Sequence, residues 1–504
     1  MKRRGWVVAL LGVSLSATAW GQGASRLDER RLLELRLPDV QIESAVAVNR
    51  EEQAASLVPY VGVKGVIGGT IHFELLLPDE WNGRLMMGGG GGFVGRVQIQ
   101  LRRAVNSGYA VVGTDTGHQA PAEWPGASWA LDDMEALVNF GHLAVHRTAE
   151  VSKAIIYAYY GVDPSYSYFV GCSTGGGQAL MAAQRYPGDF DGIVSMAPAL
   201  DWTGIAAANT HEAQVMYPNG RQQREPVVSR EDVERLYEEI IKQCDGQDGL
   251  EDGIIDDPRA VQFDLSKVQG LTKAQREAIQ AVYDGPYNAN RQIYPGVALG
   301  GEGEVAGRAA WFQWMTGPVP RLRAQADVPT MSWVFGTEIF RYFVFHDPEW
   351  DYTTYDFSSW AEDTHLAGTI LNATDPNLSS FREHGGKLIL VHGWADAVLS
   401  PLRTVQYYEE VLARDPAAKQ YARLFLLPGV MHCGAGPGPD QVDWLSVIAD
   451  WTERSTAPER LIATKRTEQG EVVMTRPIYS YPQRAAYSGS GDPNKAENFV
   501  LRRP

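Results

Sequence analysis

Ser173 stands in a pattern that is typical of an exposed nucleophile. Residues 171–175 read Gly-Cys-Ser-Thr-Gly, a G-x-S-x-G pentad. Small residues on both sides of the serine allow a sharp turn that presents its hydroxyl at the end of a strand. Such a hydroxyl, once activated, attacks carbonyl carbons, so the pattern indicates acyl transfer. Glycine and serine are common, and a purely structural turn is the alternative reading.

A serine nucleophile needs a general base and an acid that orients the base. Asp396 and His432 follow Ser173 in the order nucleophile, acid, base, which is the order of the α/β-hydrolase fold. Each of them comes shortly after an apolar run that predicts a strand. The chain has ten histidines, so a chance position of His432 in a loop is one alternative. His392 is a rival candidate for the base, but it precedes Asp396 and would invert the order. We therefore expect Ser173, Asp396 and His432 to form a catalytic triad.

The negative oxygen that forms during acyl transfer must be bound by backbone N–H groups. One donor should be the N–H of Thr174, the residue after the nucleophile, at a helix N-terminus. The other should come from the glycines at residues 88–92, where the missing side chains allow a substrate to approach the backbone. A phosphate-binding loop is the alternative, but no Gly-Lys-Ser/Thr follows these glycines.

Strands and helices alternate around these residues. The expected strands lie in residues 63–78, 85–87, 109–112, 167–170, 193–196, 387–391 and 422–427, and the expected helices in residues 149–159, 175–185, 404–413 and 442–452. This alternation predicts an α/β fold with a mostly parallel sheet covered by helices. Residues 202–382 are instead rich in Trp, Tyr, Pro, Gly and Asn and predict a large insertion. Residues 22–201 and 383–504 would then form one α/β-hydrolase domain.

The N-terminus is typical of an export signal. Residues 2–4 are basic, residues 6–17 are largely apolar, and residues 19–21 place small residues at a cleavage site. We expect residues 1–21 to be removed and the mature chain to be secreted or periplasmic. A membrane anchor is the alternative, but the apolar run is too short to span a bilayer. The net charge of −16 argues against a nucleic-acid partner and against binding to an anionic membrane.

Two of the three cysteines flank the expected triad. Cys172 directly precedes Ser173, and Cys433 directly follows His432. If the serine and the histidine are within hydrogen-bond reach, the two cysteines can lie within disulfide range. An oxidising compartment permits such a bridge. The odd number of cysteines leaves at least one unpaired.

Together these motifs resemble the tannase and feruloyl esterase family. The resemblance covers nearly the whole mature chain and rests on residues 81–84, 171–173, 244–257, 393–396, 428–433, 481–482 and 489–492. It implies the triad above, a Cys172–Cys433 disulfide, and an oxyanion hole formed by the N–H groups of Gly92 and Thr174. It also implies that residues 202–382 form a lid domain over the site.

The chain departs from the family pattern in its other disulfides. Val261 stands where the family pattern has the cysteine that pairs with Cys244, and Tyr479 and Leu501 replace a C-terminal pair. We therefore expect Cys244 to be unpaired. The bridge that is retained should serve the active site.

Residues 245–254 place three aspartates in a short glycine-rich loop. Ca²⁺ binds about six to eight oxygens from carboxylates and carbonyls. The spacing differs from that of an EF-hand, and a solvated acidic turn is the alternative. The family resemblance implies a calcium ion bound by the side chains of Asp245, Asp248 and Asp252 and by the carbonyls of Leu250 and Ile254. We expect this ion to be structural, because the loop lies far along the chain from the triad.

The expected activity is the hydrolysis of a carboxylic ester through an acyl-enzyme. The resemblance implies a small aromatic ester substrate of the feruloyl, galloyl or terephthalate type. The insertion carries many aromatic residues, including Trp311, Trp314, Trp333, Phe340, Tyr342 and Phe343, although such residues more often form cores than ligand contacts. Recognition of a free carboxylate on the substrate would favour Arg321 or Arg323.

Two other functions remain open from the sequence. A serine amidase or peptidase would use the same triad. A non-catalytic, calcium-binding secreted protein on a hydrolase scaffold is the alternative from a different class. The sequence does not fix an oligomeric state.

Overall fold

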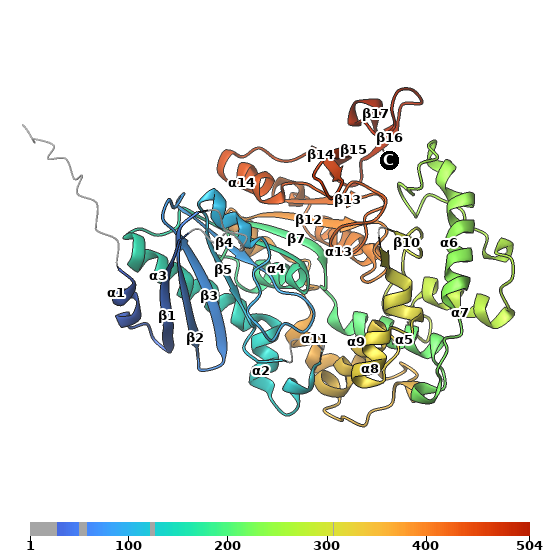
Figure 1. The fold of residues 1–504 in the computed structure, drawn as a ribbon, viewed down its shortest axis with the longest axis horizontal. Helices are drawn as coiled ribbons and strands as arrows, with labels where there is room; N and C mark the ends of the chain where they lie inside the picture. Colours follow the sequence, from blue (N-terminus) through green and yellow to red (C-terminus); the bar gives the residue numbers. More distant parts are fainter. Residues whose placement is uncertain (1–27, 50–57, 121–125, 306, 504) are drawn as a thin grey trace, which may run out of the picture.

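A nine-stranded sheet forms the centre of the protein in a computed structural model that describes residues 28–49, 58–120, 126–305 and 307–503. The strand order is β1-β2-β3-β5-β4-β6-β7-β12-β13, and Figure 1 shows the sheet flanked by helices. The expected signal peptide at residues 1–21 lies outside the described residues.

One edge of the sheet is antiparallel. It contains β1 (Val40–Val48), β2 (Tyr60–Ile67) and β3 (Ile71–Pro78), and β3 pairs antiparallel with β5 (Ala110–Thr114). The expected strand region at residues 63–78 is thus a hairpin of two strands. Its turn contains Gly68 and Gly69 at φ 63° and 77°, values that favour glycine.

The remaining strands run parallel. From β5 they continue through β4 (Arg84–Gly88), β6 (Tyr166–Ser173), β7 (Gly192–Pro198), β12 (Lys387–Gly393) and β13 (Ala422–Leu427). Carboxyl ends of parallel strands meet at one edge of a sheet, and ligand sites form there. The predicted triad and oxyanion residues lie at the ends of β4, β6, β12 and β13 or in the segments that follow them. The predicted fold class, an α/β-hydrolase core with a mostly parallel sheet, is confirmed.

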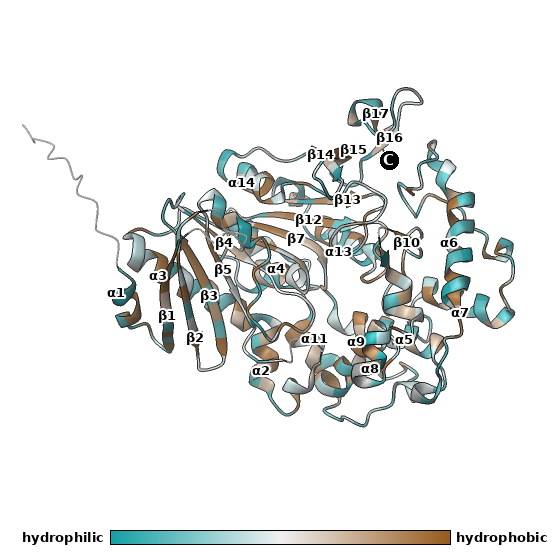
Figure 2. Cartoon of the chain, in the orientation of Figure 1, coloured by the Kyte–Doolittle hydropathy of each residue, from teal (hydrophilic) through white to brown (hydrophobic). Residues whose placement is uncertain are grey.

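Side chains of the strands alternate between two cores, one on each face of the sheet. Along β12, Leu388 and Leu390 belong to one buried cluster and Ile389 to the other. The first cluster includes residues of α3 (Ala144–Tyr160), α4 (Thr174–Arg185) and α13 (Pro401–Arg414), and the second includes residues of α14 (Trp444–Arg454). The strands are largely brown in Figure 2, as expected for a sheet that is buried on both faces.

The segment between β7 and β12 adds no strand to the central sheet. It forms α5 (Trp202–Met216), α6 (Arg230–Cys244), α7 (Lys273–Asp284), α8 (Pro320–Ala326), α9 (Met331–Glu338), α10 (Trp360–Asp363), α11 (His365–Leu371) and α12 (Ser379–Glu383). Two small hairpins pair β8 (Tyr287–Asn288) with β9 (Arg291–Gln292) and β10 (Glu304–Val305) with β11 (Arg308–Ala309). Most of this segment lies to the right of the sheet in Figure 1. Its limits as a lid domain, at residues 202 and 382, stay a prediction.

The C-terminal segment contains two hairpins that the sequence did not indicate. They pair β14 (Arg460–Arg466) with β15 (Val472–Tyr479) and β16 (Arg484–Tyr487) with β17 (Phe499–Arg502). The other helices are α1 (Glu29–Glu34) and α2 (Met134–Val138). Within the described residues, no helix combines the length and the apolar character needed to cross a bilayer.

Candidate active site

Ser173 lies at the sharp turn between β6 and α4, as predicted. Its backbone has φ 64° and ψ −124°, a conformation that costs a residue with a side chain roughly 1–3 kcal/mol. The turn requires a glycine at position 171, because a Cβ on Gly171 would lie 2.3 Å from the carbonyl oxygen of Gly175. The Ala199 N–H donates to the carbonyl of Ser173 at 2.9 Å and ties the turn to the start of the insertion.

The glycine loop after β4 runs beside Ser173. The N–H groups of Gly89, Gly90 and Gly91 donate to protein oxygens at 3.0–3.1 Å. Among the described residues, no such acceptor faces the N–H of Gly92 or the N–H of Thr174. The Thr174 hydroxyl donates to the carbonyl of Gly92 at 2.7 Å and fixes the two residues against each other. These two N–H groups are therefore available as hydrogen-bond donors.

Asp396 and His432 come together after β12 and β13. His432 Nδ1 lies 2.7 Å from Asp396 Oδ2, while Asp396 Oδ1 accepts the N–H groups of Val398 and Leu399 at 2.8 and 3.0 Å. Asp396 is fully buried. Burial by itself raises the pKa of this carboxyl, but His432 and His392 outweigh burial and hold the pKa well below its usual range. Asp396 is therefore a carboxylate that can orient an imidazole.

The rival histidine, His392, is a second neighbour of the same carboxylate. Its Nε2 lies 3.0 Å from Asp396 Oδ2 and 3.1 Å from the carbonyl oxygen of Leu399, and its Nδ1 lies 2.8 Å from the Thr404 hydroxyl. Both neighbours of Nε2 accept hydrogen bonds, so Nε2 carries a hydrogen. His392 is 1% exposed and does not line the pocket that contains Ser173. It can act on a substrate only through Asp396.

The predicted disulfide between Cys172 and Cys433 is present, with a Cα–Cα distance of 5.9 Å. It links the residue before Ser173 to the residue after His432. Cys244 is free and buried, as predicted from Val261 in the place of its partner. Val261 packs against the apolar cluster that contains Cys244, so apolar contact takes the place of a bridge there.

Ser173, His432 and the two free N–H groups line one pocket of about 450 Å³. Its walls include Phe93, Trp202, Ile205, Trp314, Met331 and Phe335. The Phe335 ring stacks on Phe93 at 4.6 Å between centroids and lies next to Gly92. The pocket is thus a largely apolar, aromatic cavity with Ser173 and His432 in its wall, which suits a flat ligand.

Only some residues of this pocket wall were predicted from the sequence. Of the six aromatic residues singled out in the insertion, Trp314 lines the pocket, whereas Trp311, Trp333, Phe340 and Phe343 are buried in apolar clusters and Tyr342 packs against one of them. Arg321 contributes to the wall, but Arg323 donates to the backbone carbonyls of Gln223 and Arg224 instead.

Several wall residues were missed. Phe93 and Phe335 come from segments that lie far apart in the sequence. Trp202, Ile205 and Asn209 are spaced i, i+3 and i+7 on α5, which places them on one helical face. That spacing was the one signal that could have revealed them.

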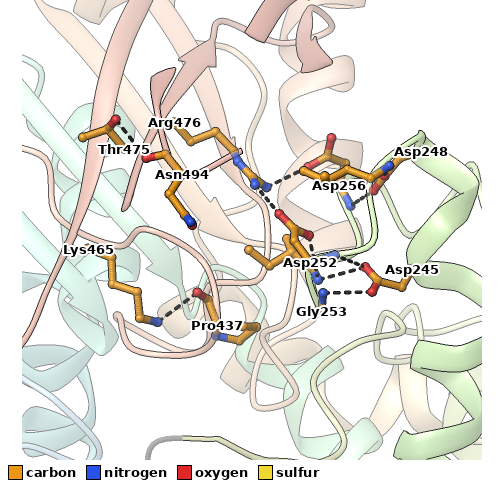
Figure 3. A network of polar contacts seen from close by, with 12 residues as sticks. Asp245, Asp248, Asp252, Gly253, Asp256, Pro437, Lys465, Thr475, Arg476 and Asn494 are labelled. Carbon is orange, nitrogen blue, oxygen red and sulfur yellow. Dashed lines mark hydrogen bonds and ion pairs between the residues drawn. The ribbon is translucent and has the colours of Figure 1, made fainter. Parts of the chain in front are cut away.

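The acidic loop of the insertion faces the C-terminal hairpins (Figure 3). Asp245 accepts the N–H groups of Asp252, Gly253 and Ile254 at 2.9–3.2 Å. The Arg476 guanidinium, from β15 and 1% exposed, donates to the carboxylates of Asp252 and Asp256. The loop carboxylates are therefore partly neutralised by protein groups.

The five predicted calcium ligands share one loop, and calcium binding there stays a prediction. Within the described residues there is no group of three or more metal-binding side chains with the spacing of a metal site. Burial raises the pKa of Asp248, and the negative charges of Asp252 and Asp245 raise it further. These crowded oxygens are the donors that a hard cation prefers, so the chemistry of the loop fits calcium.

The acidic loop lies close to the segment that carries His432, although the two are far apart in sequence. Ile254 packs tightly on Gly429. A Cβ added to Gly429 would lie 3.1 Å from Ile254 Cγ2. The Arg259 guanidinium lies 5.0 Å from the centre of the Trp394 ring, in the segment that leads to Asp396. Distance along the chain was therefore a poor guide to distance from the site.

Known proteins match this chain over most of its length. A family model described as tannase and feruloyl esterase matches residues 62–501. The chain is 32% identical over 497 residues to mono(2-hydroxyethyl) terephthalate hydrolase of Piscinibacter sakaiensis, covering 86% of this chain and 82% of that protein. It is 30% identical over 514 residues to a probable feruloyl esterase of Arthroderma benhamiae, covering 92% and 91%.

A solved structure agrees with these matches. An esterase from Aspergillus oryzae has a TM-score of 0.80 and 25% identity, and the match covers 93% of this chain and 98% of that one. Coverage this complete includes the insertion as well as the strands of the central sheet. The chain belongs to the tannase and feruloyl esterase family of carboxylic-ester hydrolases.

Proposed function

We propose that the protein is a serine esterase that releases an aromatic acid from its ester through an acyl-enzyme. One observation carries the proposal. A single pocket is lined by Ser173, by His432 backed by buried Asp396, and by Gly92 and Thr174, whose backbone N–H groups have no acceptor in the described parts of the chain. Nucleophile, base and oxyanion donors are the parts that acyl transfer needs.

In the first half of the reaction, His432 Nε2 takes the proton of the Ser173 hydroxyl as the serine oxygen attacks the ester carbonyl. The N–H groups of Gly92 and Thr174 bind the negative oxygen. His432 then gives the proton to the leaving alcohol, and the acyl group stays on Ser173. In the second half, water loses a proton to His432 and attacks the acyl-enzyme, and the acid leaves while Ser173 regains its proton. Asp396 orients His432 through Nδ1 and stabilises its charged form.

An aromatic acyl group suits the pocket. Phe93, Trp202, Trp314 and Phe335 supply flat apolar surfaces, and aromatic rings stack on such surfaces. The names of the relatives point to terephthalate and ferulate esters as the substrate class. The exposed side chains of Arg96 and Arg321 contribute to the same wall and would favour an acyl group or alcohol that carries a negative charge.

A panel of methyl ferulate, methyl gallate, chlorogenic acid and mono(2-hydroxyethyl) terephthalate tests the proposal. Hydrolysis of at least one of them, with kcat/KM well above that of methyl acetate, is the expected result. Comparable values for all four would mean that access to the pocket, rather than one contact, sets specificity. The absence of hydrolysis of any aromatic ester would overturn the proposal.

Two other functions predict different results. A serine amidase or peptidase would cleave the amide of the same acyl group at a rate comparable to the ester, so the two are assayed in parallel. A non-catalytic calcium-binding protein would not react with a fluorophosphonate. The buried Asp396 carboxylate, paired with His432, favours the esterase, because a binding protein has no use for it.

We also propose that the acidic loop binds calcium and that the chain is exported. Three crowded aspartates in a loop beside Gly429 support a structural ion that braces the segment bearing His432. The basic and apolar pattern of residues 1–21 and the disulfide support a secreted or periplasmic location.

A further inference from the structure

The central sheet loses one of its hydrogen-bonded pairs where β4 ends beside β6. Gly88, the last residue of β4, is paired with Val170 of β6, and the Gly89 N–H donates to the carbonyl of Val170 at 3.0 Å. Beyond this point the chain leaves the sheet as the glycine loop, residues 88–92, while β6 continues. Alternate residues of a parallel strand bond to the same neighbouring strand. The N–H and the carbonyl of Cys172 therefore face the side from which β4 has departed.

The side-chain amide of Gln100 takes the place of the missing strand. Its Oε1 accepts the N–H of Cys172 at 2.8 Å, and its Nε2 donates to the carbonyl of Cys172 at 3.3 Å. An amide side chain offers the same donor and acceptor as a peptide group, so it satisfies both backbone groups as a neighbouring strand would. Backbone groups that are withdrawn from water without such partners are costly.

The same amide also holds the glycine loop. Nε2 of Gln100 donates to the carbonyl of Gly90 at 3.3 Å, and that carbonyl also accepts the N–H of Gly175 at 2.8 Å. Gln100 therefore bonds to the glycine loop and to the nucleophile turn, residues 172–175, and belongs to neither. The loop ends in the N–H of Gly92 and the turn contains the N–H of Thr174, which are the two proposed oxyanion donors.

The hydrogen-bonding capacity of Gln100 is committed to the protein. Its backbone N–H donates to the carbonyl of Gly89 at 3.4 Å, and a Cβ on Gly88 would lie 2.2 Å from its carbonyl oxygen, so its backbone packs directly on the end of β4. Gln100 lines the catalytic pocket. Its amide nitrogen carries two hydrogens and already has two protein acceptors. No N–H of the side chain is left for a substrate.

We propose that Gln100 is a positioning residue that sets the distance between the two halves of the oxyanion hole. Oxyanion donors act when both lie about 2.7–3.1 Å from the position of the negative oxygen, and the Gln100 amide connects the two segments that carry them. The inference rests on the proposed esterase function and adds a residue beyond the triad and the two donors. Gln100 acts through Gly90 and Cys172 and takes no part in proton transfer.

The test compares Gln100→Met and Gln100→Glu with wild type on an aromatic ester that the wild-type enzyme hydrolyses. Methionine keeps the length of the side chain and removes its three hydrogen bonds. Glutamate keeps the acceptor for the Cys172 N–H but turns a negative charge toward two carbonyls. Both variants should lower kcat by about ten- to a hundredfold while KM changes little, because small misplacements of catalytic groups have effects of that size.

Inhibition by phenylboronic acid separates positioning from a general loss of structure. Its boron atom takes the serine oxygen as a fourth ligand and places one of its own oxygens where the negative oxygen of the ester would form. A transition-state analogue loses affinity together with the transition state. The inhibition constant Ki should therefore rise in each Gln100 variant by the factor by which kcat/KM falls.

Gln184→Met is the matched control. This glutamine of α4 donates to the carbonyl of Ala373 and to the hydroxyl of Tyr407 and does not line the catalytic pocket. Its replacement removes a bridging amide of the same kind, so Tm should fall. Because the bridge lies away from the oxyanion donors, kcat and Ki should stay near the wild-type values.

Four results would overturn the role of Gln100. They are a kcat near the wild-type value in both Gln100 variants, a loss that appears in KM instead of kcat, a fall in kcat/KM without the matching rise in Ki, or loss of the native circular dichroism spectrum in both variants. Failure of the esterase function is visible separately. A wild-type protein that hydrolyses no aromatic ester and is not labelled by a fluorophosphonate would overturn both proposals before any variant is compared.

Discussion

His392 Nε2 lies 3.0 Å from Asp396 Oδ2, the same carboxylate oxygen that His432 Nδ1 approaches to 2.7 Å. The other oxygen of Asp396 accepts two backbone N–H groups. His392 is itself held by the Thr404 hydroxyl. The carboxylate is thus fixed by four donors, of which one is the proposed base.

Replacing His392 by phenylalanine should impair catalysis without weakening substrate binding. Loss of one donor loosens Asp396 and so misplaces His432, and small misplacements cost about ten- to a hundredfold in rate. kcat should fall by that factor while KM changes little. Thr404→Val should have a smaller effect of the same kind. Unchanged kcat would leave His392 with a packing role alone.

Reduction of the Cys172–Cys433 disulfide should lower activity before it unfolds the protein. The bridge joins the neighbours of Ser173 and His432 across 261 residues of sequence. A loop of this length implies about 5.6 kcal/mol of stabilisation by loop entropy, so Tm should fall too. Reduction should abolish esterase activity at temperatures where the circular dichroism spectrum is still that of the native protein. The double variant Cys172→Ala/Cys433→Ala should behave in the same way. Cys244→Ala, which leaves the bridge intact, is the control. Parallel loss of activity and fold would make the bridge a purely structural element.

The stability of the protein should fall with rising pH because of Glu212. This side chain, on α5, accepts a hydrogen bond from the Ser332 hydroxyl at 2.5 Å, and burial raises its pKa to about 8. In the unfolded chain the pKa is about 4.3. Between these two pKa values Glu212 is protonated in the folded protein and ionised in the unfolded chain. The free energy of unfolding therefore declines by on the order of 1.4 kcal/mol per pH unit between them.

Glu212→Gln removes this dependence. The variant should gain stability relative to wild type as pH rises. The Tm of the variant minus the Tm of wild type should therefore be more positive near about pH 8 than near about pH 5. Glu231→Gln, at an exposed position of α6, should show no such trend. Equal differences in Tm at both pH values would mean that Glu212 is ionised in the folded protein.

Calcium should stabilise the protein through its acidic loop. Chelation should lower Tm, and added Ca²⁺, but not Mg²⁺, should restore it. Asp248→Asn should abolish the response to calcium. In chelator this variant should be at least as stable as wild type, because it removes a half-buried charge near Asp245 and Asp252. A wild-type Tm that does not respond to chelation, in protein that contains no calcium by elemental analysis, would leave the loop as an acidic turn.

The parts of the site that depend on short stretches of sequence could be predicted. The turn at Ser173 follows from small residues between an apolar strand and a helix start, and the cysteines follow from their adjacency to Ser173 and His432. The pocket wall could not be derived in this way. Arg321 and Arg323 both lie on α8, but one reaches the pocket and the other binds backbone carbonyls. Which way each points depends on how α8 packs, and that is a property of the folded insertion.

The most direct measurement of the central claim is the site of covalent labelling by a fluorophosphonate. We expect one equivalent of label per chain, located on Ser173 by peptide mass spectrometry and blocked by an aromatic ester that the enzyme hydrolyses. Ser173→Ala should keep the fold, lose the label and hydrolyse esters no faster than the buffer. Label on another residue, or esterase activity retained by Ser173→Ala, would contradict the assignment of Ser173 as the nucleophile.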